Sequence, residues 1–305
     1  MNHRLHRLLA IIFTAVLSFS MLGQASGIEH RASSIQRIVT LSPNLTEIVF
    51  TLGLGDRVVG VSNNCDWPDE AKLKPKMGTF WQPNTETIIA AKPDLVVCES
   101  FLQHKETAEV LKRAGLNVLS LRVESIEELF SAIKRIGQAA DCNDKANRLV
   151  ADINNRLAQI RAKTTPAKKV KVLWVMQTEP LRVAGVNTFI NEIIEMAGGQ
   201  NAISPTGDQY PAVGTEVILI CGAEVIIQSA MSAKNIPVEQ TEAGKFWSRF
   251  AILPAVRDKR IYVIDPDRVL RLGPRLPEGA MAVANLLHPE LFAQPNDPNG
   301  DKMQK

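Results

Sequence analysis

The chain has 305 residues, with 35 basic and 32 acidic side chains and a formal net charge of +3. Removing residues 1–25, which hold two arginines and no acids, leaves a charge of +1, so a nucleic acid is not expected as the main partner. Four cysteines in a chain of this length exclude a disulfide scaffold. The roughly 280 residues that remain exceed one ordinary core and suit two lobes.

Residues 1–25 have the pattern of a secretory signal peptide. Arg4 and Arg7 precede an uncharged run at 8–22, and small residues at 23–25 fit a cleavage site. The run is short for a membrane span, and no cysteine follows it to carry a lipid anchor. We therefore expect a soluble exported product that begins near Ser26.

The N-terminal lobe is predicted at residues 35–142. Short β-branched runs separated by helical patterns indicate an α/β fold with a mostly parallel sheet. Strands are expected at 37–42, 58–61, 95–98 and 117–121, with helices starting at 44 and 85, one ending near 114, and one running from the capping box at 125–128 to about 140.

A continuous helical pattern at residues 143–162 predicts a rigid helix that joins the lobes. The C-terminal lobe, predicted at 168–292, starts again with a strand at 170–175 and a helix at 187–197. A late strand is expected at 261–264 and a last helix at 277–288. Residues 293–305 are polar and are expected to be a disordered tail.

A degenerate repeat relates the two lobes. Residues 85–97 and 215–227 both start with Thr-Glu, continue as an apolar run, reach a breaker, and end in an acid followed by a β-branched strand. Each copy predicts a short helix that leads into a buried strand. The sequence thus predicts two Rossmann-like lobes with central mostly parallel sheets, joined by a single long helix.

Catalytic and metal-binding signatures are missing from the sequence. There is no glycine-rich phosphate loop, nucleophile elbow, zinc helix or Cys-x-x-Cys pair. Only His104 and His288 lie inside the predicted lobes, too few for an ordinary zinc or manganese site, although His104 remains open as a lone ligand. We expect a protein that is not an enzyme, with no cofactor and no resident metal.

Aromatic residues are scarce but fall in loops near strand ends. This group, which predicts a cleft for a large, flat, partly apolar ligand, is Trp67, Phe80, Trp81, Phe101 and Tyr210. Arg271 and Arg275 flank Gly273-Pro274, and either could bind a phosphate or a carboxylate.

Cys65 and Cys98 both follow predicted strands of the first lobe. A disulfide at the cleft wall and two separate semi-buried thiols are both compatible with this placement.

Glu86 and Glu216 occupy the same position in the two repeat copies. An acid in the first turn of a helix complements the helix dipole, which would explain either residue alone. Two exposed acids related by a pseudo-twofold would also suit docking onto a two-fold symmetric partner that carries arginines.

Three segments together resemble one family. Residues 37–43, 84–96 and 271–275, the last followed by His288-Pro289-Glu290, are similar to the periplasmic substrate-binding proteins of ABC importers for vitamin B12, ferric siderophores and haem. The likeness covers about residues 37–292. Within the family, the Cys65-Asp66-Trp67-Pro68 loop and Trp81 make the chain most similar to the vitamin B12 binders, whereas Tyr210 stands in place of their tryptophan.

The resemblance implies a monomeric periplasmic protein that captures a corrinoid between its lobes and delivers it to a permease dimer in the inner membrane. The ligand contacts that it implies are Trp67, Phe80, Trp81, Glu99, Tyr210 and Arg271. Glu86 and Glu216 match the family's permease-docking acids. Glu99 departs from the pattern, because B12 binders have an aromatic residue there. A siderophore, haem, or an exported enzyme that uses the same cleft are the alternatives.

Overall fold

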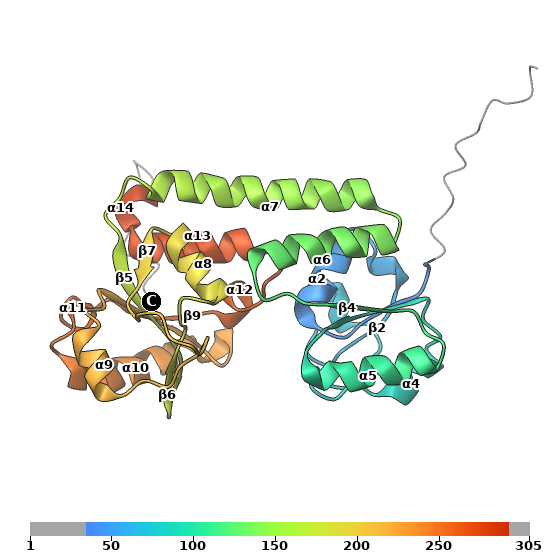
Figure 1. Ribbon diagram of the computed structural model, residues 1–305, viewed down its shortest axis with the longest axis horizontal. Coiled ribbons are helices and arrows are strands. Elements are labelled where there is room, and N and C mark those ends of the chain that lie inside the picture. The colour runs from blue at the N-terminus through green and yellow to red at the C-terminus, as the bar shows by residue number, and fades with distance from the viewer. Residues whose placement is uncertain (1–34, 293–305) are drawn as a thin grey trace, which may run out of the picture. The chain divides into compact units, whose positions relative to one another are not determined.

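The computed structural model describes residues 35–292, apart from the side chain of Gln103 (Figure 1). The predicted signal peptide at 1–25 and the predicted tail at 293–305 lie outside these residues. Within them, no helix is both long enough and apolar enough to cross a membrane.

The N-terminal lobe is a parallel four-stranded sheet in the order β2-β1-β3-β4. Its strands are β1 (Ile38–Thr40), β2 (Val58–Val61), β3 (Leu95–Glu99) and β4 (Val118–Leu121). Its helices are α2 (Pro43–Thr51), the 3-10 turn η1 (Gly55–Arg57), α3 (Asp69–Lys72), α4 (Thr85–Ala90), α5 (Leu102–Arg113) and α6 (Ile126–Ala139). Alternate residues of β3 pack into different cores, Leu95 and Val97 with α2 and α6, Val96 and Cys98 with α4 and α5.

The C-terminal lobe has a mixed sheet in the order β6-β5-β8-β9, with β7 paired to the first half of β5. Its strands are β5 (Val170–Thr178), β6 (Leu181–Val183), β7 (Gly199–Asn201), β8 (Val225–Ser229) and β9 (Ile261–Ile264). Only β6 is antiparallel, at the edge of the sheet. The helical elements of this lobe are α8 (Phe189–Met196), α9 (Thr215–Ile220), η2 (Ala233–Asn235), α10 (Ile236–Trp247), η3 (Ser248–Phe250), α11 (Pro254–Arg257), α12 (Pro266–Val269), α13 (Leu276–Leu287) and α14 (Pro289–Phe292).

The repeat found in the sequence is a repeat of structure. The helices α4 and α9 have six residues each, the strands β3 and β8 have five each, and both pairs begin at matching positions of the repeat. Lys92 and Gly222 also match, and both have left-handed backbones with φ of 47° and 65°. The acid that precedes each strand accepts a backbone N–H bond from the start of the lobe's first strand: Asp94 from Arg37 and Glu224 from Lys171, each at 2.9 Å.

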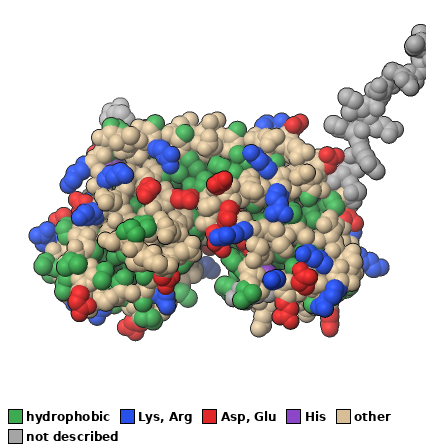
Figure 2. Space-filling view, in the orientation of Figure 1, with side chains coloured by type: hydrophobic (Ala, Val, Ile, Leu, Met, Phe, Trp, Pro, Cys, Tyr) green, Lys and Arg blue, Asp and Glu red, His purple; other side chains and the backbone are tan. Residues whose placement is uncertain are grey.

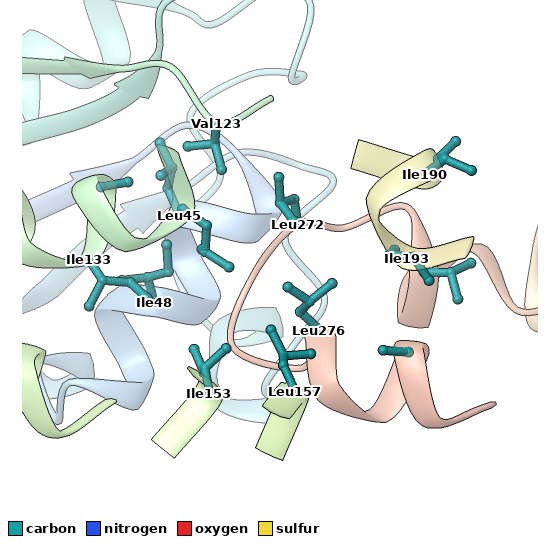
Figure 3. Packing of buried hydrophobic residues seen from close by; sticks show 14 of the residues in the cluster. Leu45, Ile48, Val123, Ile133, Ile153, Leu157, Ile190, Ile193, Leu272 and Leu276 are labelled. Atoms are coloured by element: carbon teal, nitrogen blue, oxygen red, sulfur yellow. The ribbon is translucent and has the colours of Figure 1, made fainter. Parts of the chain in front are cut away.

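The linking helix α7 (Asn143–Thr164) packs against α6 of the first lobe and against α8 and α13 of the second (Figure 1). Ile153 and Leu157 on its inner face belong to one continuous apolar cluster. That cluster also holds Leu45 and Ile48 of α2 and Leu276 of α13 (Figure 3). The predicted α/β fold of two lobes joined by one long helix is therefore confirmed, and the lobes share a core under that helix.

Candidate functional site

A cleft of about 600 Å³ opens between the two lobes, and the space-filling view is hollowed between them at its lower edge (Figure 2). This volume is typical of small-molecule sites, which span roughly 300 to 1000 Å³. Both lobes contribute to its lining, which comprises Pro43, Asn44, Asn64, Phe80, Trp81, Glu99, Phe101, Val123 and Glu124 from the first lobe and Thr188, Phe189, Gln209, Tyr210, Leu270, Arg271 and Leu272 from the second. Five of the six predicted ligand contacts lie here; the exception is Trp67.

Aromatic rings form the wall of the first lobe. Phe80 packs edge to face on Trp81 at 4.8 Å between ring centroids and on Phe101 at 6.0 Å. Trp81 is 62% exposed, so a large apolar face is available to a ligand. The loop is held by the N–H of Phe80, which donates to Asn64 Oδ1 at 2.9 Å.

His104 supports this wall and does not reach the cleft. Its buried ring lies edge to face against Phe80, at 4.9 Å between centroids, and its Nε2 bonds to the carbonyl oxygen of Phe80. His104 is not among the residues that line the cleft. Within residues 35–292 no group of three or more His, Cys, Asp or Glu side chains is arranged to hold a metal ion. Because its ring lies against Phe80 and outside the lining, His104 is not placed to contact a ligand in the cleft.

Tyr210 and Phe189 supply aromatic surface from the second lobe. The Tyr210 backbone is fixed at both ends, since its N–H donates to Asp208 Oδ1 at 3.0 Å and its carbonyl accepts from Arg182 Nη1 at 2.8 Å. Burial, with a smaller effect of the Glu124 charge, raises the pKa of the Tyr210 phenol. The ring therefore presents a neutral hydroxyl.

Glu99 is a buried carboxyl group in the cleft wall. Only 3% of the residue is exposed. Its Oε1 accepts a hydrogen bond from Asn44 Nδ2 at 2.7 Å, whereas its Oε2 is enclosed and has no partner within the described residues. Burial raises the pKa of Glu99 to about 7, the Asn44 bond opposes the rise, and the charges of Glu124 and Glu128 add to it.

Arg271 lines the cleft, but its charge is already paired. Its Nη1 lies 2.5 Å from Asp66 Oδ1 and 3.6 Å from Glu47 Oε1, and its Nη2 lies 2.9 Å from Asp267 Oδ1. Despite opposing desolvation, the hydrogen bond and charge of Arg271 hold the pKa of Asp66 below its usual range. Arg271 thus connects the lobes, and its guanidinium is not free to bind a phosphate.

Arg275 also bridges the lobes, behind the cleft. It forms a bidentate pair with Glu47, with Nε to Oε2 at 2.9 Å and Nη2 to Oε1 at 2.6 Å. Glu47 lies on α2 and is only 2% exposed. Burial raises the pKa of this carboxyl group, whereas the two arginines lower it. The paired guanidinium also lies over the Trp67 ring, at 4.8 Å from its centroid.

Trp67, expected from the sequence to contact the ligand, does not line this cleft in the structure. Its ring contacts Arg275 and lines a separate hollow beside Phe50 and Pro68. The sequence placed Trp67 correctly in a loop after a strand, but a loop of this length can turn its ring to either side. In this structure the ring covers the ion pair that joins the lobes.

The disulfide that the sequence left open between Cys65 and Cys98 does not form. Both side chains are buried free thiols; Cys221 is also buried and free, and Cys142 is free and partly buried. Cys65 Sγ bonds to Thr46 Oγ1 at 3.0 Å, and Cys98 Sγ lies 3.4 Å from Ser120 Oγ. The two belong to the separate cores on opposite faces of the sheet, which explains why they do not meet.

Glu86 and Glu216 lie in the first turns of α4 and α9 and are both exposed. The two helices lie at the lower edge of the view, opposite the linking helix α7 (Figure 1). Exposed apolar side chains accompany the acids, namely Ile89 on α4 and Val217, Leu219 and Ile220 on α9. Neither acid lines the cleft.

Several lining residues were not predicted from the sequence. Asn44, Glu124, Phe189 and Gln209 carry no motif: Asn44 and Phe189 lie in the first turns of α2 and α8, and Glu124 and Gln209 lie in loops that precede α6 and α9. Polar or aromatic residues at the ends of elements, next to the C-terminal edges of parallel strands, were the signal available for them.

Comparison with known proteins gives a consistent result. A periplasmic binding protein family model matches residues 38–268. The chain is 32% identical to an uncharacterised ABC transporter substrate-binding lipoprotein, YvrC, of Bacillus subtilis over 85% of this chain and 82% of that protein. It is 27% identical to a vitamin B12-binding protein of Vibrio parahaemolyticus over 79% and 85%.

Among solved structures, a possible iron-binding, periplasmic solute-binding protein of Staphylococcus epidermidis superposes with a TM-score of 0.75 at 28% identity, over 83% of this chain and 99% of that one. Fold, two-lobed cleft and sequence therefore agree. The chain belongs to the periplasmic binding protein family.

Proposed function

We propose that this protein is a periplasmic solute-binding protein that captures a corrinoid between its lobes, without catalysis, and delivers it to an ABC transporter permease dimer in the inner membrane. The observation that carries the proposal is the cleft with aromatic walls on both lobes, Phe80 and Trp81 on one side and Phe189 and Tyr210 on the other. Rings on opposite walls suit a broad, flat macrocycle. The similarity to a vitamin B12-binding protein supports the same ligand class.

The charges of the cleft favour a neutral ligand. Arg271 is the cationic side chain among the described lining residues, and three acids already pair with it. Glu99 and Glu124 contribute acid to the same lining. A corrinoid carries uncharged amide groups around its ring, whereas haem carries carboxylates and ferric catecholates are anions. Burying an anion without a free cation costs free energy, so the cleft disfavours those two ligands.

A ferric siderophore or haem is the second candidate. The similarity to a possible iron-binding protein favours it, and the Tyr210 phenol is a group in the cleft that could approach iron. An exported enzyme is the least favoured alternative, since no nucleophile and base are paired in the cleft lining.

Calorimetric titration of the mature protein with cyanocobalamin, haemin and ferrichrome tests the ligand. We expect saturation by cyanocobalamin at one site, and a loss of at least tenfold in affinity for Trp81→Ala. Trp67→Ala is the matched control, because this tryptophan lies outside the cleft, and it should bind as the wild type does. Saturation by haemin or ferrichrome without binding of cyanocobalamin would reject the corrinoid.

Docking onto the permease is proposed for Glu86 and Glu216. Both are exposed, both lie in the first turn of a helix at matching repeat positions, and each helix also exposes apolar side chains. Exposed acids on helices that also expose apolar side chains suit specific association with arginines of a two-fold symmetric partner.

Charge reversal tests the docking. We expect Glu86→Arg with Glu216→Arg to abolish stimulation of transport by the reconstituted permease while ligand affinity stays unchanged. The control pair is Glu127→Arg with Asp144→Arg, which reverses two other exposed first-turn acids, on α6 and α7. Equal transport by both pairs would show that Glu86 and Glu216 only complement their helix dipoles.

A further inference from the structure

Glu99 has a geometry that distinguishes its two oxygens. Asn44 Nδ2 donates to Oε1 at 2.7 Å, so Oε1 acts as an acceptor. Oε2 is enclosed, has no partner within the described residues, and belongs to a side chain in the cleft wall. When the carboxyl group is neutral, its proton therefore resides on Oε2, because Oε1 already accepts. A neutral Glu99 has one unused O–H donor just beneath the cleft wall, and a ligand can reach it only if the side chain turns towards the cleft.

The groups around Glu99 oppose its ionisation. Glu124 and Glu128, from the segment after β4 and from α6, add negative charge, although Arg122 compensates part of it through contacts of 2.7 Å and 3.3 Å with these two acids. Asn44 from α2 is uncharged. Arg271, the cation of the same lining, is held by Asp66, Asp267 and Glu47. Among residues 35–292, no cation is therefore paired with Glu99, and burial disfavours its charged form.

We propose that, when the cleft fills, the Glu99 side chain takes up a proton and turns Oε2, which is enclosed in this structure, towards the cleft to donate a hydrogen bond to an acceptor oxygen of the ligand. A ligand amide carbonyl supplies such an acceptor. The inference rests on the proposed binding function and adds to it a specificity determinant and a coupling between ligand and proton. The only transfer is one proton from solvent to the carboxylate, with no covalent step.

Coupling of this kind has a defined pH dependence. A group that is neutral in the complex and ionises in the free protein weakens binding as the pH rises through its free-state pKa, here about 7. Affinity should stay constant below that pH and then fall up to about tenfold per pH unit until the pKa of the complex is reached. Proton uptake should rise towards about one per ligand at mildly alkaline pH.

Calorimetry at pH 5.5 to 9, in buffers of different ionisation enthalpy, measures affinity and proton uptake together. With cyanocobalamin as the probe, we expect proton uptake by the wild type and none by Glu99→Gln. The glutamine keeps an acceptor for Asn44 and a donor in place of the O–H, so this variant should bind with an affinity that does not vary with pH. Glu124→Gln should keep the uptake but shift its midpoint to lower pH, because it removes a charge that opposes ionisation.

The outcomes separate this inference from the proposed ligand. If cyanocobalamin fails to bind the wild type, the corrinoid is rejected, and the proton uptake is measured with haemin or ferrichrome, whichever saturates the site. Binding of any of the three without proton uptake, or with uptake that persists in Glu99→Gln, overturns the role of Glu99. If none of the three binds, both proposals are rejected.

Discussion

The two lobes repeat one unit and yet use its acids differently. Glu47 on α2 and Glu192 on α8 occupy matching positions, and each contacts the other lobe. Glu47 is buried and holds Arg275 by two charged hydrogen bonds, whereas Glu192 Oε2 accepts one bond, at 3.0 Å, from the backbone N–H of Ile126. The repeat therefore preserves where the lobes meet, while the strength of each contact depends on the residue that the partner lobe supplies.

Removing each acid in turn should give the largest difference in stability between the two lobes. Glu47→Ala leaves Arg275 without its partner, and we expect a loss of about 3 to 5 kcal/mol in the free energy of unfolding. Glu192→Ala loses one hydrogen bond, which should cost about 1 kcal/mol. Denaturant titration at neutral pH measures both, and Arg275→Met combined with Glu47→Ala should recover part of the larger loss. Equal losses for the two single variants would show that the lobe contacts are equivalent.

Two residues at a second pair of matching positions should differ in how their contribution to stability depends on pH. Glu99 ends β3, and Ser229 ends β8 at the same position of the repeat; both have an enclosed oxygen without a partner within residues 35–292. The folded-state pKa of Glu99 is raised to about 7, so the stability it contributes is present below its unfolded pKa and lost as the pH rises towards 7. Over that range the wild type should lose about 3 kcal/mol relative to Glu99→Gln.

The test is the difference in unfolding free energy between wild type and variant at pH 4.5, 6 and 8. Ser229→Ala is the control from the other lobe and should change stability by the same amount at each pH, because a serine hydroxyl does not titrate in this range. A pH-independent difference for Glu99→Gln would mean that folding does not shift the pKa of Glu99.

The acids that hold the start of each sheet should give a smaller contrast. Asp94 Oδ2 accepts the N–H of Arg37 and a second backbone N–H at the same strand start, whereas Glu224 Oε2 accepts one backbone N–H within the described part of the chain, that of Lys171. We expect Asp94→Ala to cost about 2 kcal/mol and Glu224→Ala about 1 kcal/mol. Thermal denaturation of the two variants ranks them, and the reverse order would show that the number of bonds does not decide the cost.

The left-handed positions should show the smallest effects, with opposite signs. Gly222→Ala places a Cβ only 3.7 Å from Lys171 Nζ, an ordinary contact, so its cost of about 1 kcal/mol comes from the backbone conformation. Lys92→Gly relieves the same strain in the other lobe and should gain at most about 1 kcal/mol. A loss of stability for Lys92→Gly, measured by thermal denaturation, would show that the freedom of the unfolded glycine outweighs that relief.

Local sequence patterns were enough to predict the type of fold. The repeat at 85–97 and 215–227 predicted both helix–strand units, because the apolar run, the breaker and the β-branched strand are all properties of neighbouring residues. The helix α10 was not predicted. Its apolar residues are few and their spacing is irregular, and only Ala243 and Trp247 are buried in it. Its position depends on packing against β9, which the local sequence does not specify.

Contacts between residues far apart in the chain could not be predicted from the sequence. Glu47 and Arg275 are separated by 228 positions, and Arg271 and Asp66 by 205. The sequence identified Arg271 and Arg275 as charges aimed by a rigid turn but could not show that acids of the other lobe already hold them. For Cys98 the direction was decided by strand alternation, since it faces α4 and α5 while its neighbour Glu99 lines the cleft.

The apolar cluster beneath α7 has a consequence for proteolysis. Ile153 and Leu157 pack with residues of both lobes, so opening either lobe alone would expose part of the core of the other (Figure 3). Cleavage of the connections near α7 by a protease therefore requires global unfolding, because local opening does not expose them. Any ligand that binds only the folded chain lowers the population of that open state and so protects both halves at once.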